Sequence, residues 1–278
     1  MTLHLFFRKG VMDIVEILGF TGAFLIGLIL GLIGGGGSIL TVPILVYALS
    51  FNPVIATAYS LFVVGSTAAV GAIKNMIKGK VDFKTAFTFA IPAFIAVYLT
   101  RAFLIPSVPD ELFEVNGFVV TKNLGIMMFF ALVMLFAALG MIAHKTPRVT
   151  QEYKYQPPKL LLIIYSVIIG FVTGAVGAGG GFLIVPTLVI FAKLSMKKAV
   201  ATSLFIVAIN SLIGFTGDLQ HTAIDWEFLI PFTSLSILGI FIGIWINKFI
   251  DGKKLKKAFG WFVLVMGMYI IYKELSMS

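Results

Sequence analysis

The chain is dominated by long apolar segments, and this feature restricts it to one class of fold. A helix needs about 20 apolar residues to cross a bilayer. Only 12% of the 278 residues are charged and 59% are hydrophobic, so the chain cannot build a surface that faces water. The sequence therefore predicts an all-α membrane protein and excludes a soluble globular enzyme. We identify ten apolar segments: 14–33, 38–50, 55–74, 84–104, 122–143, 160–176, 181–192, 198–217, 227–247 and 256–273.

Two of these segments are too short to cross a bilayer. Segments 38–50 and 181–192 hold about a dozen residues each and reach roughly 20 Å as helices. Each follows a glycine cluster: the first cluster is Gly34-Gly35-Gly36-Gly37-Ser38, and the second cluster is Gly177-Ala178-Gly179-Gly180-Gly181. We therefore expect glycine-broken short helices near the membrane midplane. The stretch 105–121 contains Pro and acidic residues, which predict a structured surface loop.

The chain contains an internal repeat. Residues 27–83 align without a gap on residues 170–226, at an offset of 143. Apolar composition alone would produce some matches, but it would not align Gly and Pro in one register. The sequence predicts a first repeat over 1–143, a cytoplasmic linker over 144–159 and a second repeat over 160–278. Matched pairs include Gly27/Gly170, Gly31/Gly174, Gly34/Gly177, Pro43/Pro186, Ser60/Ser203, Gly71/Gly214 and Asp82/Asp225.

Charges in equivalent loops indicate that the two repeats are inverted. Loop 51–54 has no charge, whereas its counterpart carries Lys193, Lys197 and Lys198. The next loop shows the opposite trend, with Lys74, Lys78, Lys80 and Lys84 in the first half against Asp218, Asp225 and Glu227 in the second. Because Lys and Arg stay on the cytoplasmic side, equivalent loops lie on opposite sides. Inversion requires an odd number of crossings, which predicts about five helical segments per repeat and both termini outside. This arrangement puts 16 of 21 basic and 3 of 12 acidic residues on the cytoplasmic side.

The glycine clusters predict an anion-binding site. A short helix that begins at a cluster presents unpaired N–H groups and a positive dipole end. Inverted repeats bring such broken helices together near the midplane. The alternative is that the glycines only permit tight packing or a hairpin. A nucleotide-binding loop is not expected, because no Lys-Ser/Thr follows either cluster. The expected substrate-binding residues are Gly34, Gly35, Gly36, Gly37, Ser38, Gly177, Gly179, Gly180 and Gly181.

The residues around the clusters resemble a known family. The stretches Gly-Leu-Ile-Gly-Gly-Gly-Gly-Ser-Ile-Leu-Thr-Val-Pro (31–43) and Gly-Ala-Val-Gly-Ala-Gly-Gly-Gly-Phe-Leu-Ile-Val-Pro (174–186) are similar to the paired signatures of the TauE/SafE sulfite exporter family. The resemblance covers nearly the whole chain. It implies a secondary transporter that moves a small sulfur-containing anion, of the sulfite, sulfonate or thiosulfate class. Ser38, where the second cluster has Gly181, departs from the pattern.

Polar side chains inside the segments complete the expected site. Ser60, Ser203 and Asn210 are expected to face the protein interior and contact substrate, with helix–helix hydrogen bonding as the alternative. Asp218 is the candidate for coupling to a proton or cation, unless it is simply a solvated helix end. No Lys or Arg is expected in the middle of a segment. Arg101 is expected to snorkel to the outer headgroups, with attraction of anions as the alternative.

Enzyme chemistry is not expected. The three His residues lie near loops or ends, no His-Glu-x-x-His occurs, and the chain has no Cys. We expect no cofactor, no metal and no nucleic acid. The expected partners are a small sulfur anion, membrane lipid and a coupling proton or cation, and a homodimer is left open. The expected location is the cell membrane, as a multi-pass protein. An anion channel with the same site and a carrier for a small carboxylate are the alternatives. The His residues are His4, His144 and His221.

Overall fold

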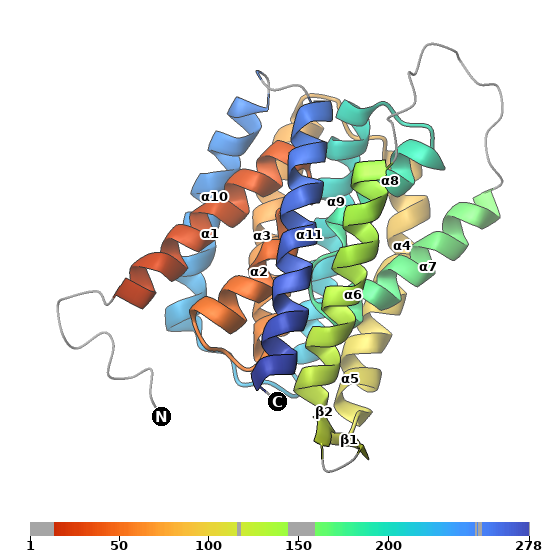
Figure 1. Cartoon of the computed structure of the whole chain (residues 1–278). Coiled ribbons are helices and arrows are strands. Elements are labelled where there is room, and N and C mark those ends of the chain that lie inside the picture. Colours follow the sequence, from red (N-terminus) through yellow and green to blue (C-terminus); the bar gives the residue numbers. More distant parts are fainter. Residues whose placement is uncertain (1–13, 116–117, 144–158, 248, 250–251, 278) are drawn as a thin grey trace.

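The structure is a computed structural model that describes residues 14–115, 118–143, 159–247, 249 and 252–277 (Figure 1). All ten predicted segments form helices, which confirms a helical membrane architecture. The linker predicted over 144–159 lies outside the described residues apart from Lys159. The helical elements are α1 (Ile14–Ile33), α2 (Ser38–Pro43) continued by η2 (Ile44–Ala48), α3 (Pro53–Ile77), α4 (Phe83–Leu99) continued by η3 (Thr100–Leu104) and α5 (Ile105–Ser107), α6 (Lys122–Ala143), α7 (Lys159–Val176), α8 (Gly181–Ile190), α9 (Met196–Asp218), α10 (Trp226–Ile246) and α11 (Gly252–Met277).

Nine of the described helices fall into two classes by length and composition. In the part of the chain that the structure describes, five helices are long and apolar enough to cross a membrane: Pro53–Ile77, Phe83–Ser107, Lys122–Gly140, Met196–Asp218 and Trp226–Ile246. Four apolar helices are shorter: Ile17–Ile33, Ser38–Ala48, Leu160–Val176 and Gly181–Ile190. The two helices that follow the glycine clusters are thus short, as predicted. At 1.5 Å per residue, α8 reaches about 15 Å, half of a bilayer core.

The predicted surface loop at 105–121 is ordered, but part of it is a β-hairpin. Strand β1 (Glu111–Val115) pairs with β2 (Phe118–Thr121) in antiparallel register, with Phe113 opposite Val120. Val and Thr favour strands because their branched side chains suit a pleated surface. The pattern of Pro and acidic residues predicted a structured surface loop here and did not indicate the two strands. The described fold is therefore helical apart from this one hairpin.

Helices α3 and α9 lie side by side in the middle of the bundle. Helix α1 packs on α10 at one flank, α7 packs on α4 at the other, and α6 pairs with α11 across the front (Figure 1). Glycine makes the flank contacts close. A Cβ on Gly27 would collide with the carbonyl of Ser236, and one on Gly170 would collide with that of Ala93. The two flanks therefore use equivalent contacts, since these pairs match at the offset of 143 found in the sequence.

Two hydrogen bonds fix the direction of α3 relative to α9. The Asp82 N–H, just after the end of α3, donates to Thr202 Oγ1 near the start of α9 at 3.0 Å. The Asp225 N–H, after the end of α9, donates to the Tyr59 hydroxyl near the start of α3 at 2.7 Å. The two bonds are also related by the offset of 143. Each helix thus begins where the other ends, so α3 and α9 are antiparallel.

The same contacts sort the charged loops onto two ends of the bundle. The Lys-bearing loop after α3 lies beside the start of α9, where Lys197 and Lys198 are exposed. The loop after α9, which carries Asp225 and Glu227, lies beside the start of α3. Basic and acidic loops are therefore at opposite ends of the central helix pair.

Candidate functional site

The two glycine clusters meet inside the fold. A Cβ on Gly35 would lie 2.6 Å from the Cα of Gly181, so the two main chains are in direct contact. These clusters use backbone angles that other residues rarely adopt. The structure thus brings together the two breaks that the sequence predicted. Residues with positive φ in the clusters are Gly34 (74°), Gly35 (134°), Gly177 (71°), Gly179 (66°) and Gly180 (68°).

Several N–H groups at the starts of the short helices are already hydrogen-bonded. The amides of residues 38–40 donate to the carbonyls of residues 35–37 at 3.3, 3.3 and 3.2 Å. At α8, the amides of Leu183 and Ile184 donate to the Gly180 carbonyl at 2.9 and 3.0 Å. The amides at the start of α2 are therefore already paired, against the prediction, whereas at α8 the paired amides are those of the third and fourth residues. Bonds that span three residues satisfy the α2 amides, as they commonly do at helix ends.

Ser38 and Ser203 hold the first cluster in shape. The Ser38 hydroxyl donates to the Gly35 carbonyl at 2.7 Å. The Ser203 hydroxyl contacts the Gly34 carbonyl and lies 2.9 Å from the Val200 carbonyl. Both side chains are fully buried. These two predicted site residues thus lie at the cluster and bind its main chain.

Ser60 and Asn210 are buried without a hydrogen-bond partner among the described residues. The unpaired atoms are the Ser60 hydroxyl and both polar atoms of the Asn210 amide. Three further buried hydroxyls share this state: Thr41, Thr173 and Ser211. Buried polar groups are normally paired, so an unpaired group needs an explanation. Two of these groups adjoin the second cluster, since a Cβ on Gly179 would lie 2.9 Å from Ser211 Oγ and one on Gly180 would meet Thr173 Oγ1.

Arg101 is buried in the protein and does not reach the headgroups. Its side chain is 0% exposed, so the snorkelling prediction is wrong. The continuous helix runs on past Arg101 to Ser107, so Arg101 lies in the last third of the helix and not at its end. Arg101 lies in η3, a π-helical turn. Its Nη1 donates to Thr57 Oγ1 at 3.1 Å and lies 3.4 Å from Asp218 Oδ1.

Asp218 is buried as well, and its alternative interpretation as a solvated helix end is wrong. It is 4% exposed and forms an ion pair with Arg101. The pair adjoins the second cluster, since a Cβ on Gly177 would lie 2.5 Å from Arg101 Nη2. Arg101 and Thr57 are not among the substrate-binding residues expected from the sequence. One feature of the sequence could have pointed to Arg101: the equivalent position at the offset of 143 holds Ile244, so the charge is present at only one of the two positions.

Comparison with known families identifies the chain. The family described as Sulfite exporter TauE/SafE matches residues 19–270. The chain belongs to this family. It is therefore a multi-pass membrane transporter of the TauE/SafE family and not an enzyme. The match includes both glycine clusters and the Arg101–Asp218 pair.

Relatives of this TauE/SafE transporter are named as membrane transporters. A "Probable membrane transporter protein" of Xylella fastidiosa (strain 9a5c) is 28% identical over 90% of this chain and 92% of its own length. The "Probable membrane transporter protein YunE" of Bacillus subtilis is 26% identical over 90% of this chain and 98% of its own length. "Probable membrane transporter protein MJ0441" of Methanocaldococcus jannaschii is 36% identical over 40% of this chain and 45% of its own length. No solved structure matches the chain.

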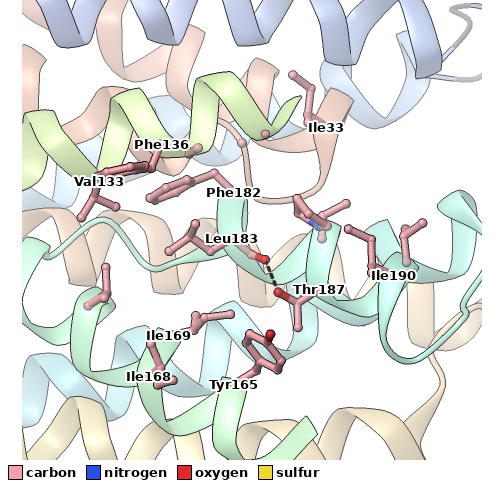
Figure 2. A pocket seen from close by; sticks show the side chains of 18 of the residues that line it. Ile33, Val133, Phe136, Tyr165, Ile168, Ile169, Phe182, Leu183, Thr187 and Ile190 are labelled. Carbon is pink, nitrogen blue, oxygen red and sulfur yellow. Dashed lines mark hydrogen bonds between the residues drawn. The ribbon is translucent and has the colours of Figure 1, made fainter. Parts of the chain in front are cut away.

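The TauE/SafE transporter also has an apolar cavity of about 430 Å³ between α6, α7 and α8 (Figure 2). Phe136 and Phe182 lie on its wall, and Gly36 and Gly181 border it. The Thr187 hydroxyl on its wall donates to the Leu183 carbonyl at 2.8 Å, so this hydroxyl is already engaged. The residues that line the cavity carry no charge. This lining suits hydrocarbon better than it suits an anion.

A metal centre has no support in the part of the transporter that the structure describes. No group of three or more His, Asp or Glu side chains lies close enough there to hold a metal ion. His221 is exposed, while His4 and His144 lie outside the described residues. The buried polar groups of the described interior include the Arg101 guanidinium, the Asp218 carboxylate, several hydroxyls and the Asn210 amide.

Proposed function

We propose that this TauE/SafE transporter moves a small sulfur-containing anion, of the sulfite, sulfonate or thiosulfate class, across the cell membrane by alternating access. The observation that carries the proposal is the contact between the two glycine clusters, with unpaired buried polar groups around them. Such groups supply hydrogen-bond donors without an excess of fixed charge, so an anion can bind and still be released. The family's description as sulfite exporters supports the substrate class.

The proposed architecture is two inverted repeats of five helical segments, over 1–143 and 160–278, with a cytoplasmic linker over 144–159. Helices α3 and α9 occupy equivalent positions in the repeat and run antiparallel, which supports the inversion. The Lys-bearing end of the bundle would be cytoplasmic by the positive-inside rule. Both termini would then lie outside.

The proposed substrate site is made by the two glycine clusters with Ser38, Ser60, Ser203 and Asn210. Ser38 and Ser203 would hold the first cluster in place through their bonds to its carbonyls. Ser60 and Asn210 would contact the anion, because their polar atoms are buried and unused. Asp218 would couple transport to a proton or cation.

The test is flux through the purified protein in proteoliposomes. Uptake of sulfite, sulfate, thiosulfate, an alkyl sulfonate and acetate is measured with and without an ion gradient. We expect saturable, gradient-dependent uptake of a sulfur oxyanion. Ohmic single-channel currents would indicate an anion channel and not a carrier. Uptake of acetate alone would indicate a carrier for small carboxylates and not for sulfur anions. A lack of flux for every anion would overturn the proposal.

A matched pair of variants tests the site. Gly179→Leu adds a side chain where even a Cβ would lie 2.6 Å from Val64 and 2.9 Å from Ser211 Oγ. We therefore expect this variant to abolish flux. Gly140→Leu is the control, because nothing lies within 4 Å of a Cβ there. Wild-type flux in a well-folded Gly179→Leu protein would contradict the site assignment.

A further inference from the structure

Arg101 has hydrogen-bonding capacity that the fold does not use. Its side chain is the largest fully buried one among the described residues. A guanidinium carries five N–H donors in a fixed planar arrangement. Here Nη1 contacts Thr57 and Asp218, whereas Nε and Nη2 have no partner among the described residues. An unpaired buried donor is costly, and the cost is greater for a charged group.

The two unused nitrogens lie on the same edge of the guanidinium. The Nε–H and one N–H of Nη2 are parallel and can bind two oxygens of one oxyanion, which is the bidentate geometry of Arg with carboxylate and phosphate. We propose that this free edge of Arg101, meaning its Nε and Nη2 donors, binds the transported anion through two of its oxygens. The inference rests on the proposed function and names the residue that recognises the charge of the substrate.

The surroundings of Arg101 support a role in binding. A Cβ on Gly177 would lie 2.5 Å from Nη2, and one on Gly217 would lie 3.0 Å from the Arg101 Cβ. Glycine at these positions therefore makes room for the guanidinium at the second cluster. Arg101 also lies in the π-helical turn η3. Such turns inside α-helices are rare and are found frequently at functional sites.

Asp218 would act as a resident counter-charge on the opposite side of the guanidinium, at Nη1, and would weaken the attraction of Arg101 for an anion. Its Oδ1 lies 3.4 Å from Nη1, longer than the 2.7–2.9 Å of a strong charge-assisted bond. Its Oδ2 has no partner among the described residues. An anion at the free edge would gain two charge-assisted bonds where Asp218 makes one long contact. Asp218 therefore competes with the substrate for the charge of Arg101.

The Arg101–Asp218 ion pair has no charged counterpart at the positions that match it at the offset of 143. Those positions therefore supply a control variant. At the offset of 143, Arg101 corresponds to Ile244 and Asp218 corresponds to Asn75. Asn75 is buried and donates to the Gly71 carbonyl of its own helix at 3.0 Å. Asn75→Ala thus removes a buried hydrogen bond at the equivalent position without touching the proposed anion contact.

Binding is measured by calorimetry on the full-length protein in detergent, with sulfite, sulfate, a sulfonate and chloride as probes. Removal of both charges in the Arg101→Gln/Asp218→Asn variant leaves no unpaired buried charge. We expect it to fold and to bind the oxyanion roughly tenfold to hundredfold more weakly. The single variant Asp218→Asn should bind roughly tenfold more tightly, since the competing carboxylate is gone. Asn75→Ala should bind like wild type. Chloride, which has no pair of oxygens, should not compete at equal concentration.

The outcomes separate this inference from the proposed function. Wild-type affinity in the folded double variant, or weaker binding in folded Asp218→Asn, would overturn the inference and leave the function standing. If wild type binds none of the oxyanions, the proposed function fails and the inference fails with it. Arg101→Lys keeps the charge and lacks the parallel pair of donors, so it tests the free edge if the double variant does not fold. Weaker oxyanion binding in Arg101→Lys would support the free edge, and unchanged binding would overturn it.

Discussion

Asn210 is the residue at which stability and transport are expected to conflict. Both polar atoms of its amide are buried without a partner among the described residues. Leu has nearly the same shape, so Asn210→Leu removes the cost of the unpaired amide, about 1–3 kcal/mol. We expect a higher apparent melting temperature and a loss of anion flux. Melting curves and proteoliposome uptake on the same preparation check this.

A control for Asn210 is Ser166→Ala. Ser166 is fully buried, and its hydroxyl already donates to the Ile163 carbonyl at 2.7 Å. The change removes a satisfied group in α7, so the melting temperature should not rise and flux should persist. Retained flux in Asn210→Leu would show that the amide has no part in substrate binding.

Single residues also show where sequence reasoning reaches its limit. Burial of Ser60, Ser203 and Asn210 could be predicted, because polar groups in a bilayer turn towards the protein. The burial of Arg101 could not, because it depends on a tertiary partner, Asp218, that lies 117 residues away along the chain. A charge close to the end of an apolar segment also looks like a membrane-surface anchor. The structure contradicts that interpretation because the helix continues past Arg101 to Ser107.

At the scale of elements, two equivalent hydrogen bonds join the ends of α3 and α9. Tyr59→Phe removes the acceptor of the Asp225 N–H, and Thr202→Val removes that of the Asp82 N–H. Each change should lower the free energy of unfolding by about 1 kcal/mol. The bonds lie at opposite ends of the helix pair, so the double variant should show the sum. Unfolding in a denaturing detergent measures the free energy of unfolding of the two single variants and the double variant. A clearly non-additive effect in the double variant would contradict the expectation that the two bonds act independently.

The glycine breaks are the elements that the sequence predicted best. Gly35→Ala places a Cβ against Gly181 at a φ of 134°, where other residues are strained by about 1–3 kcal/mol. We expect a lower melting temperature, as measured by thermal unfolding. In contrast, Gly140→Ala lies in a helix with nothing within 4 Å of the new Cβ, so it should be neutral or slightly stabilising. Equal stability of the two variants would contradict the close contact of the clusters.

The elements that the sequence analysis missed depend on local detail. The helix boundaries at 53–77 and 196–218 extend past the predicted apolar segments because polar residues can occupy helix ends. Asp82 and Asp225 cap α4 and α10 through bonds to the Thr85 and Phe228 amides. The β-hairpin was missed because its apolar and acidic residues do not alternate strictly enough to identify strands.

At the scale of the whole molecule, the orientation of the repeats can be tested by labelling. The chain has no Cys, so Lys197→Cys and Gln220→Cys each introduce a single reactive thiol at an exposed position. These positions bracket α9, whose 23 residues span roughly 34 Å. We expect an impermeant reagent to label position 220 from outside and position 197 only after the membrane is opened. Labelling of both from one side would contradict the proposed topology.

The internal match at an offset of 143 can be seen in the sequence alone, because Gly and Pro keep one register there. The close packing of α1 on α10 and of α7 on α4 was not predictable, since it depends on which glycines face a neighbouring carbonyl. Contacts such as Gly27 with Ser236 require the three-dimensional arrangement. The segment pattern therefore fixes the number of helices, while the pairing of helices comes from the structure.

The Arg101–Asp218 pair makes the two ends of the α3–α9 pair differ in the electrostatic cost of separating the helices there. Movement that separates the helices at the end of α9 has to pull opposite charges apart in a medium of low dielectric constant. At the equivalent end, the corresponding positions hold Ile244 and Asn75, which carry no charge. We therefore expect the empty protein to rest with the ion-pair end closed and the Lys-bearing end more easily opened. Two side chains would thereby give the transporter a preferred resting direction.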